Sequence, residues 1–267
     1  AFYWCPNLHS ITIPSSVTTI GNKVFYDCFS LQSITIPPSV TSIGNNAFYN
    51  CSRLESIFVD NKNLQYVSND GILFTKNYET LLRFPSRHHL TTYTIPPSVT
   101  SISDSAFSGC SFLQSITIPP SVTSIGNKVF YDCFFLHPIT IPSSVTSIGY
   151  SVFSGCSHLQ RITIPTGVSS IGKTMFSSCF NLHSITIPTS VTSIGDFAFS
   201  KCYNLQSISI PSSVTSIGDF AFSCCSQLTS IEIPQGVTSI GNSAFSNCSN
   251  LKSITVDHQN LQYTSND

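Results

Sequence analysis

Hydrophobic and polar residues follow one another along this chain in a pattern that returns every 23 residues. In residues 113–135 a leucine opens the unit, isoleucines stand three and five places later, and valine, isoleucine, phenylalanine and cysteine hold later fixed places. Equivalent leucines open eleven units: Leu8, Leu31, Leu54, Leu90, Leu113, Leu136, Leu159, Leu182, Leu205, Leu228 and Leu251. A repeat of this period predicts a solenoid, because one unit cannot bury its apolar face without its neighbours.

Each unit is expected to contain two short extended segments and a compact turn. Residues 33–36 (Ser-Ile-Thr-Ile) alternate with period two, which predicts a strand with the isoleucines inward and the hydroxyls outward. Residues 40–43 predict a second extended piece that Gly44 closes. The apolar residues of 47–54 fall at helical spacing, which predicts a short helix or 3₁₀ turn. Equivalent strands should pair in parallel, about 4.8 Å apart.

The unit at residues 54–89 is irregular, since 36 residues separate Leu54 from Leu90. Residues 72–75 (Ile-Leu-Phe-Thr) and 80–84 (Thr-Leu-Leu-Arg-Phe) flank a four-residue loop, 76–79, which predicts a β-hairpin. Residues 69–71 (Asn-Asp-Gly) predict a turn just before it. Two interpretations stay open: a solvated insert that relieves a long uniform stack, or a recognition loop that projects from the solenoid.

Leu-x-x-Ile-x-Ile followed by Val, Ile and Phe, with Ile-Pro after the strand and Ile-Gly-x-x-Ala-Phe-x-x-Cys further on, resembles the leucine-rich repeat of the BspA-like subclass. The resemblance covers essentially the whole chain. It implies a right-handed superhelix, with a parallel β-sheet on the concave face and short helices or 3₁₀ turns on the other side. BspA-like proteins are surface proteins, so the resemblance also implies an extracellular, cell-surface location and adhesion to host or bacterial surface or matrix proteins.

Ten of the eleven cysteines share one repeat position beside the inward phenylalanine and leucine. A cysteine in such a place is a small buried hydrophobe, and parallel side chains in a ladder do not easily reach disulfide geometry. Free buried thiols are the prediction, with disulfides and a metal as the alternatives. Cys224 stands one place before the ladder and is expected to point outward.

Composition excludes several classes of function. Charged residues make up 9% of the chain and the formal net charge is −1, which argues against a nucleic-acid partner and against insertion of this part of the chain into a membrane. No Ser, His and Asp, or Cys and His, are placed as a catalytic set, and no phosphate-binding loop is present. The prediction is a non-enzyme without cofactor or metal.

The outward hydroxyls of the strands are the candidate binding face. In a structural interpretation, the serines and threonines are present because they favour strands and keep a surface of low charge soluble. The functional interpretation is a broad protein-binding face, and an ice-binding array is a third. The candidate ligand-binding residues are Thr94, Ser115, Thr117, Thr140, Arg161, Thr163, Ser184 and Thr186 on the strands and Lys76, Tyr78 and Glu79 on the hairpin.

The domain prediction is one leucine-rich repeat array over residues 1–267 with the irregular unit at 54–89. Residues 1–8 align with 47–54, so the chain is expected to be a fragment of a longer protein whose targeting and anchoring segments lie elsewhere. Uncapped ends predict end-to-end self-association at high concentration. The functional prediction is adhesion through a protein ligand. The alternative is a structural spacer that presents other domains.

Overall fold

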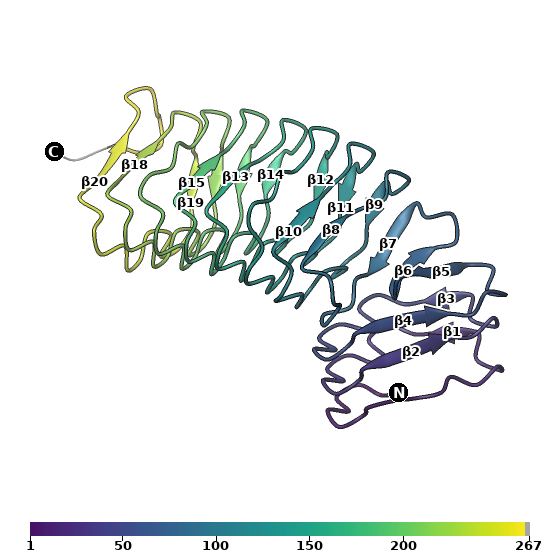
Figure 1. The fold of residues 1–267 in the computed structure, drawn as a ribbon. Coiled ribbons are helices and arrows are strands. Elements are labelled where there is room, and N and C mark those ends of the chain that lie inside the picture. Colours follow the sequence, from purple (N-terminus) through teal and green to yellow (C-terminus); the bar gives the residue numbers. More distant parts are fainter. Residues whose placement is uncertain (265–267) are drawn as a thin grey trace.

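The structure is a computed structural model, and it describes residues 1–264. Two rows of short strands run along it (Figure 1). The first row contains the Ser-Ile-Thr-Ile segments. Its strands are β2 (Ser33–Ile36), β4 (Ser56–Val59), β8 (Thr92–Thr94), β10 (Ser115–Thr117), β13 (Arg161–Thr163), β15 (Ser184–Thr186), β18 (Ser230–Ile233) and β20 (Ser253–Val256).

Each strand of the second row has two residues and lies at the end of the second extended segment of its unit. They are β1 (Thr19–Ile20), β3 (Ser42–Ile43), β9 (Ser101–Ile102), β11 (Ser124–Ile125), β12 (Ser147–Ile148), β14 (Ser170–Ile171), β16 (Ser193–Ile194), β17 (Ser216–Ile217) and β19 (Ser239–Ile240). Pairing within both rows is parallel and joins equivalent residues of neighbouring units, such as Ile34 with Ile57 and Ile125 with Ile148. The predicted parallel solenoid is confirmed.

The first row is weaker where proline enters it. In the unit that Leu136 opens, Pro138 stands at the start of the expected strand. Only an isolated parallel bridge, between Ile116 and Ile139, remains there. A proline has no N–H to give to a strand ladder, which explains the loss.

The prediction of a helix or 3₁₀ turn is wrong for residues 1–264, where this side of every unit is a series of turns. Two residues per unit have positive φ, for example Asn46 (56°) and Asn50 (57°). Residues in this conformation interrupt a right-handed helix. Many of the backbone bonds run between units instead: the Phe25 N–H donates to the Ala47 carbonyl (2.9 Å) and the Asp27 N–H to the Tyr49 carbonyl (3.1 Å). We call this third row of stacked segments the turn row.

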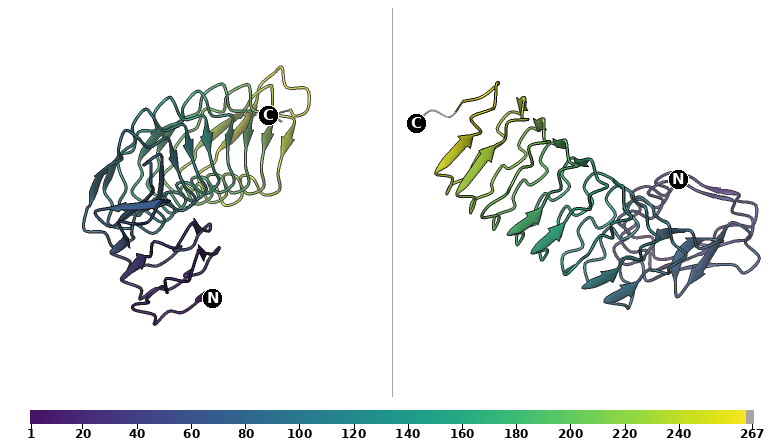
Figure 2. Two further views of the ribbon diagram at one scale, coloured as in Figure 1. Left: turned by 90° about the vertical axis from the view of Figure 1, so that its right-hand side faces the viewer. Right: turned by 90° about the horizontal axis from the view of Figure 1, so that it is seen from above.

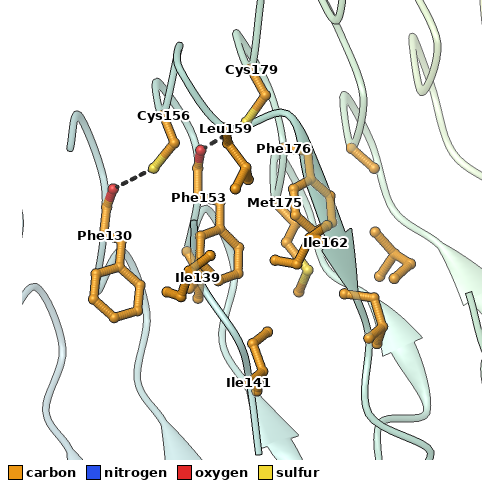
Figure 3. Packing of buried hydrophobic residues seen from close by; sticks show 14 of the residues in the cluster. Phe130, Ile139, Ile141, Phe153, Cys156, Leu159, Ile162, Met175, Phe176 and Cys179 are labelled. Atoms are coloured by element: carbon orange, nitrogen blue, oxygen red, sulfur yellow. Dashed lines mark hydrogen bonds between the residues drawn. The ribbon is translucent and has the colours of Figure 1, made fainter. Parts of the chain in front are cut away.

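The core is a stack of equivalent side chains. Phe130, Phe153 and Phe176 are fully buried, with ring centroids 5.6 and 5.5 Å apart. Figure 3 shows them beside the isoleucines of the first row and the ladder cysteines. Stacked rings at this separation add attraction to the burial of apolar area. The repeat position of each phenylalanine therefore defines the core, as the pattern predicts.

The predicted hairpin is present, and an additional strand precedes it. β6 (Ile72–Thr75) pairs antiparallel with β7 (Thr80–Arg83) across the loop at residues 76–79, and β5 (Tyr66–Asn69) pairs antiparallel with the other edge of β6. β7 then pairs in parallel with β9, so the three strands extend the second row. The turn between β5 and β6 is Asp70-Gly71, both with positive φ, as the Asn-Asp-Gly signal indicates.

The hairpin strands separate two hydrophobic cores. Leu73 belongs to the core of the N-terminal units, whereas Ile72 and Phe74 belong to the core of the C-terminal units. Successive residues of a strand face opposite sides, so β6 can serve as a wall that both cores share. Neither open interpretation of the insert describes strand β6, because Ile72, Leu73 and Phe74 are buried, whereas the exposed residues of the hairpin lie in its loop at 76–79.

The stack changes direction at this wall. In Figure 1 the strands β1 to β4 pile up along one axis, and the units from β9 to β20 continue along another. Figure 2 shows the same change from two further sides. We refer to residues 1–53 as the N-terminal array, to 54–89 as the joint and to 90–264 as the C-terminal array. No helix within residues 1–264 has the length and apolarity that crossing a membrane requires.

Candidate binding surfaces

The predicted strand-face residues lie on two separate pairs of strands. Thr94 is paired with Thr117 in β8 and β10, and Arg161 with Ser184 in β13 and β15. Thr140 belongs to the unit between these pairs, the one that Pro138 weakens. All eight predicted residues face solvent at least in part, and all but Ser115 are well exposed. They form a polar surface with one charge, that of Arg161.

The hairpin loop does not extend this surface. Lys76 and Glu79 are exposed, but Tyr78 is half-buried with its ring 5.2 Å from that of Phe74. The Glu79 carbonyl accepts from the Thr100 N–H (2.8 Å), which binds the loop to the corner between the two strand rows. Because β7 joins the second row, the loop and the strand-face residues belong to different sheets.

A cleft with a volume of about 360 Å³ lies between the two arrays. Gly44 to Tyr49 of the N-terminal array form one wall, and Ser101 to Ser105 with Ser124 to Gly126 and Ser147 form the other. Leu73, Leu82 and Arg83 of the hairpin close it. We call it the elbow cleft. Its lining mixes hydroxyl and amide groups with isoleucine and leucine, a composition typical of ligand sites, which favour interfaces between domains.

The turn row is interrupted at this cleft. Where another regular unit follows, three backbone N–H groups of each turn segment donate to it, as Lys128, Phe130 and Asp132 do to the unit that Leu136 opens. The equivalent N–H groups of Asn46, Phe48 and Asn50 have no acceptor within residues 1–264. The irregular unit has a turn segment around Phe84, but that segment pairs with the following unit, where the Phe84 N–H donates to the Ala106 carbonyl (2.7 Å), and it accepts no bond from these three N–H groups. At Asn46 and Phe48, which line the elbow cleft, the backbone therefore has hydrogen-bond donors that regular units use internally.

Arg83 is a buried charge at the same place. Its side chain donates to the carbonyls of Ser105 and Ser108 and to the Ser86 hydroxyl. The residue is 4% exposed, its Nε–H has no acceptor among residues 1–264, and no carboxylate in that range pairs with it. Buried charges are normally paired, and here two backbone carbonyls and a hydroxyl take the place of a carboxylate at the base of the elbow cleft.

Aromatic side chains and a lysine lie beside the elbow cleft. Tyr3, Tyr26 and Tyr49 stack from unit to unit, with centroids 5.1 and 4.7 Å apart. The Lys128 ammonium reaches across from the C-terminal array to within 5.3 Å of the Tyr49 ring and 5.7 Å of the Tyr131 ring. Burial raises the pKa of Tyr49, so its hydroxyl stays protonated and available as a donor.

The ladder cysteines are structural. All eleven cysteines are free, and eight of the ten in the ladder are buried as predicted, whereas Cys5 and Cys248 in the terminal units are partly exposed. The Cys156 thiol donates to the Phe130 carbonyl and the Cys179 thiol to the Phe153 carbonyl, at 3.1 and 3.0 Å (Figure 3). Burial raises the pKa of these thiols well above 9.0, which leaves them unreactive. Cys224 is partly exposed, as predicted.

Sequence reasoning did not identify the elbow cleft. Its donors lie on the turn side of the unit at 31–53, where the repeat itself shows nothing unusual. Two signals were available: Arg83 stands between Leu82 and Phe84 at the end of the hairpin, and Tyr26, Tyr49 and Tyr131 share one repeat position. That these residues meet depends on the change of direction at the joint, which no local pattern reveals.

The fold and repeat define a leucine-rich repeat solenoid. The family model described as the BspA type leucine rich repeat region matches residues 1–81, 83–202 and 169–267, in six copies. The chain belongs to this family, whose members are repeat scaffolds.

Solved structures agree with this assignment. The chain is similar to a leucine-rich repeat protein from Eubacterium ventriosum, at 33% identity with a TM-score of 0.69, over 80% of this chain and 64% of that one. It is also similar to a leucine rich cell surface protein from Faecalibacterium prausnitzii, at 29% identity with a TM-score of 0.55, over 98% of this chain and 63% of that one. The chain thus spans less than two thirds of either protein. We find no match among curated protein sequences.

Proposed function

We propose that this chain is a non-enzymatic, extracellular protein-binding array that acts in adhesion to host or bacterial surface or matrix proteins, with the elbow cleft as its anchor point. The elbow cleft carries the proposal: it combines unused backbone donors, the buried Arg83 and the Tyr49–Lys128 contact at one place. Tyrosine and arginine are the residues in which interface binding energy concentrates. The similarity to a cell surface protein supports the location.

The strand-face residues and the hairpin loop form the second part of the proposed surface. Their hydroxyls, Arg161, Lys76 and Glu79 give a broad polar area around the anchor point. Polar areas of this kind exclude water around an anchor and add complementarity more than affinity. The alternative function, a structural spacer, is supported by how uniform this polar area is, because a surface without anchor residues would bind a ligand weakly.

A blocking substitution tests the proposal. Ser147 lies on β12, is exposed and lines the elbow cleft, whereas Ser239 holds the same repeat position on β19 far along the array. We expect immobilised chain to bind at least one protein from a panel of surface and matrix proteins. Ser147→Arg should weaken that binding about tenfold or more, and Ser239→Arg should leave it unchanged.

Two other outcomes would contradict the proposed anchor point or the proposed binding function. Equal binding by both variants, with loss on replacing Thr163 by arginine, would move the anchor to the strand face. No binding by the intact chain to any protein of the panel would favour the spacer.

A further inference from the structure

We propose that Asp70, His88 and His89 form a binding site for a divalent transition metal ion of the zinc type at the joint. One possible ligand atom from each residue lies within 4.8 Å of the others. This site is separate from the elbow cleft and does not depend on the proposed function.

The two histidines converge on one carboxylate. The Nε2 atoms of His88 and His89 lie 3.7 and 3.6 Å from the Oδ2 atom of Asp70, and the two rings stack with centroids 4.5 Å apart. Zinc binds imidazole nitrogen and carboxylate oxygen at about 2.0–2.2 Å, which places ligand atoms about 3.4 Å apart around a tetrahedral ion. A small movement of exposed side chains would bring these atoms to that spacing.

The fold positions the site from both sides. Asp70 stands in the β5–β6 turn, which β4 fixes through the bond from the Ile57 N–H to the Gly71 carbonyl (2.9 Å). His88 is 1% exposed in its side chain and packs on the Phe84 ring at 4.7 Å. The Asp70 and His89 side chains are 56% and 67% exposed, so an ion can reach them from solvent. A rigid buried ligand with two accessible partners is a partly preorganised site.

Without an ion, the His88 Nε2 atom lies 2.6 Å from the Asp70 backbone carbonyl, a contact in which Nε2–H is the donor. An ion at Nε2 takes the place of this proton, and the neutral ring then carries its proton on Nδ1. The 3.3 Å contact from the Leu90 N–H to Nδ1 is given up in exchange. The Asp70 carbonyl, adjacent to Nε2, is positioned to become a further oxygen ligand.

Imidazole and carboxylate together favour zinc and its neighbours over calcium or magnesium, which prefer oxygen alone. An ion here would connect the hairpin turn to the segment that leads into β8. Because it binds the folded state, it should raise the midpoint of thermal unfolding.

Calorimetric titration of the chain with Zn²⁺ in a non-chelating buffer, with thiols kept reduced, tests the site. We expect one ion per chain and a higher unfolding temperature in its presence. Outer-shell changes already cost about 10- to 100-fold in metal affinity, so Asp70→Asn and His89→Ala should each weaken binding at least tenfold. Asparagine tolerates the positive φ of position 70, and both side chains are exposed, so the variants should fold.

His258→Ala is the matched control, because His258 lies 3.5 Å from Asp257 but has no second histidine beside it. It should bind Zn²⁺ as the unchanged chain does. Binding that survives in both Asp70→Asn and His89→Ala, or no binding up to millimolar Zn²⁺, would overturn the proposal.

Discussion

The C-terminal array and the joint differ in what each unit packs against. In the array, wherever another regular unit follows, each unit meets a copy of itself, and the three donors of its turn segment find their acceptors in that copy. In the joint the copy is replaced by a hairpin, and β6 meets a different core on each face. In the regular array, repetition gives the backbone N–H groups their acceptors. At the joint, the interruption leaves the Phe48 N–H without an acceptor and buries the Arg83 guanidinium without a carboxylate, both within residues 1–264. It also brings Asp70, His88 and His89 together.

The C-terminal array has a ladder of buried thiols and the joint has none, because no cysteine lies between Cys51 and Cys110. Burial raises the pKa of Cys110 to about 12 from an ordinary 9.0, and also raises that of Cys133 well above 9.0. A raised folded-state pKa means stability that is present below pH 9 and lost as the pH rises toward the folded value. One pH unit above 9 costs about 1.4 kcal/mol per thiol, and eight cysteines are buried.

We therefore expect the free energy of unfolding to fall steeply between pH 9 and pH 11, measured by urea titration at each pH. Tyrosines also titrate in this range, so a variant decides the cause. Replacing Cys156 and Cys179 by alanine should make the pH dependence shallower. The same slope in that variant would show that the ladder thiols do not cause the loss.

The next largest effect concerns the stack inside the regular array. Phe153→Ala removes a fully buried ring that stacks on Phe130 and Phe176. Truncation of a buried phenylalanine costs about 3–5 kcal/mol in the free energy of unfolding, and chemical denaturation will measure it. The exposed Phe135 is the control, and Phe135→Ala should change stability by about 0.5 kcal/mol or less. Equal costs would contradict the assignment of the repeat position to the core.

A smaller effect is expected at the joint itself. Arg83→Ala removes the donors to the Ser105 and Ser108 carbonyls. Hydrogen bonds to charged groups contribute about 1.5–3 kcal/mol each, but removing an unpaired buried charge offsets part of that loss. We expect a net destabilisation of about 2 kcal/mol by denaturation, against about 0.5 kcal/mol or less for the exposed Arg161→Ala. A stabilised Arg83→Ala variant would mean that the buried charge costs more than its bonds return.

Much of the fold follows from the repeat. A fixed period places the isoleucines, phenylalanine and cysteine of every unit, so their burial and the parallel pairing are predictable without coordinates. The apolar residues of 47–54 lie at spacings of 1, 4 and 7 from the first, which predicts a helix, but the same spacing also fits the turns that the structure has there. The decisive feature is the positive φ at residues such as Asn46 and Asn50, which serves bonds between units and has no apolar signature.

The joint shows where such prediction stops. Its hairpin could be predicted from Ile72-Leu73-Phe74 and Leu81-Leu82, but not its role as a shared wall. Uninterrupted apolar runs do indicate burial on both faces, and this signal was available. The second face is covered by the N-terminal array only because the stack turns there, so the elbow cleft and the place of Arg83 depend on long-range geometry.

The central claim is that β6 separates two cores that are stabilised independently. Native-state hydrogen exchange on a Leu73→Ala variant tests it, since Leu73 is 1% exposed and contributes to the N-terminal core alone. We predict that amide protection falls in residues 8–59 and is retained in residues 113–240. An equal loss of protection along the whole chain would show a single cooperative core and contradict the account.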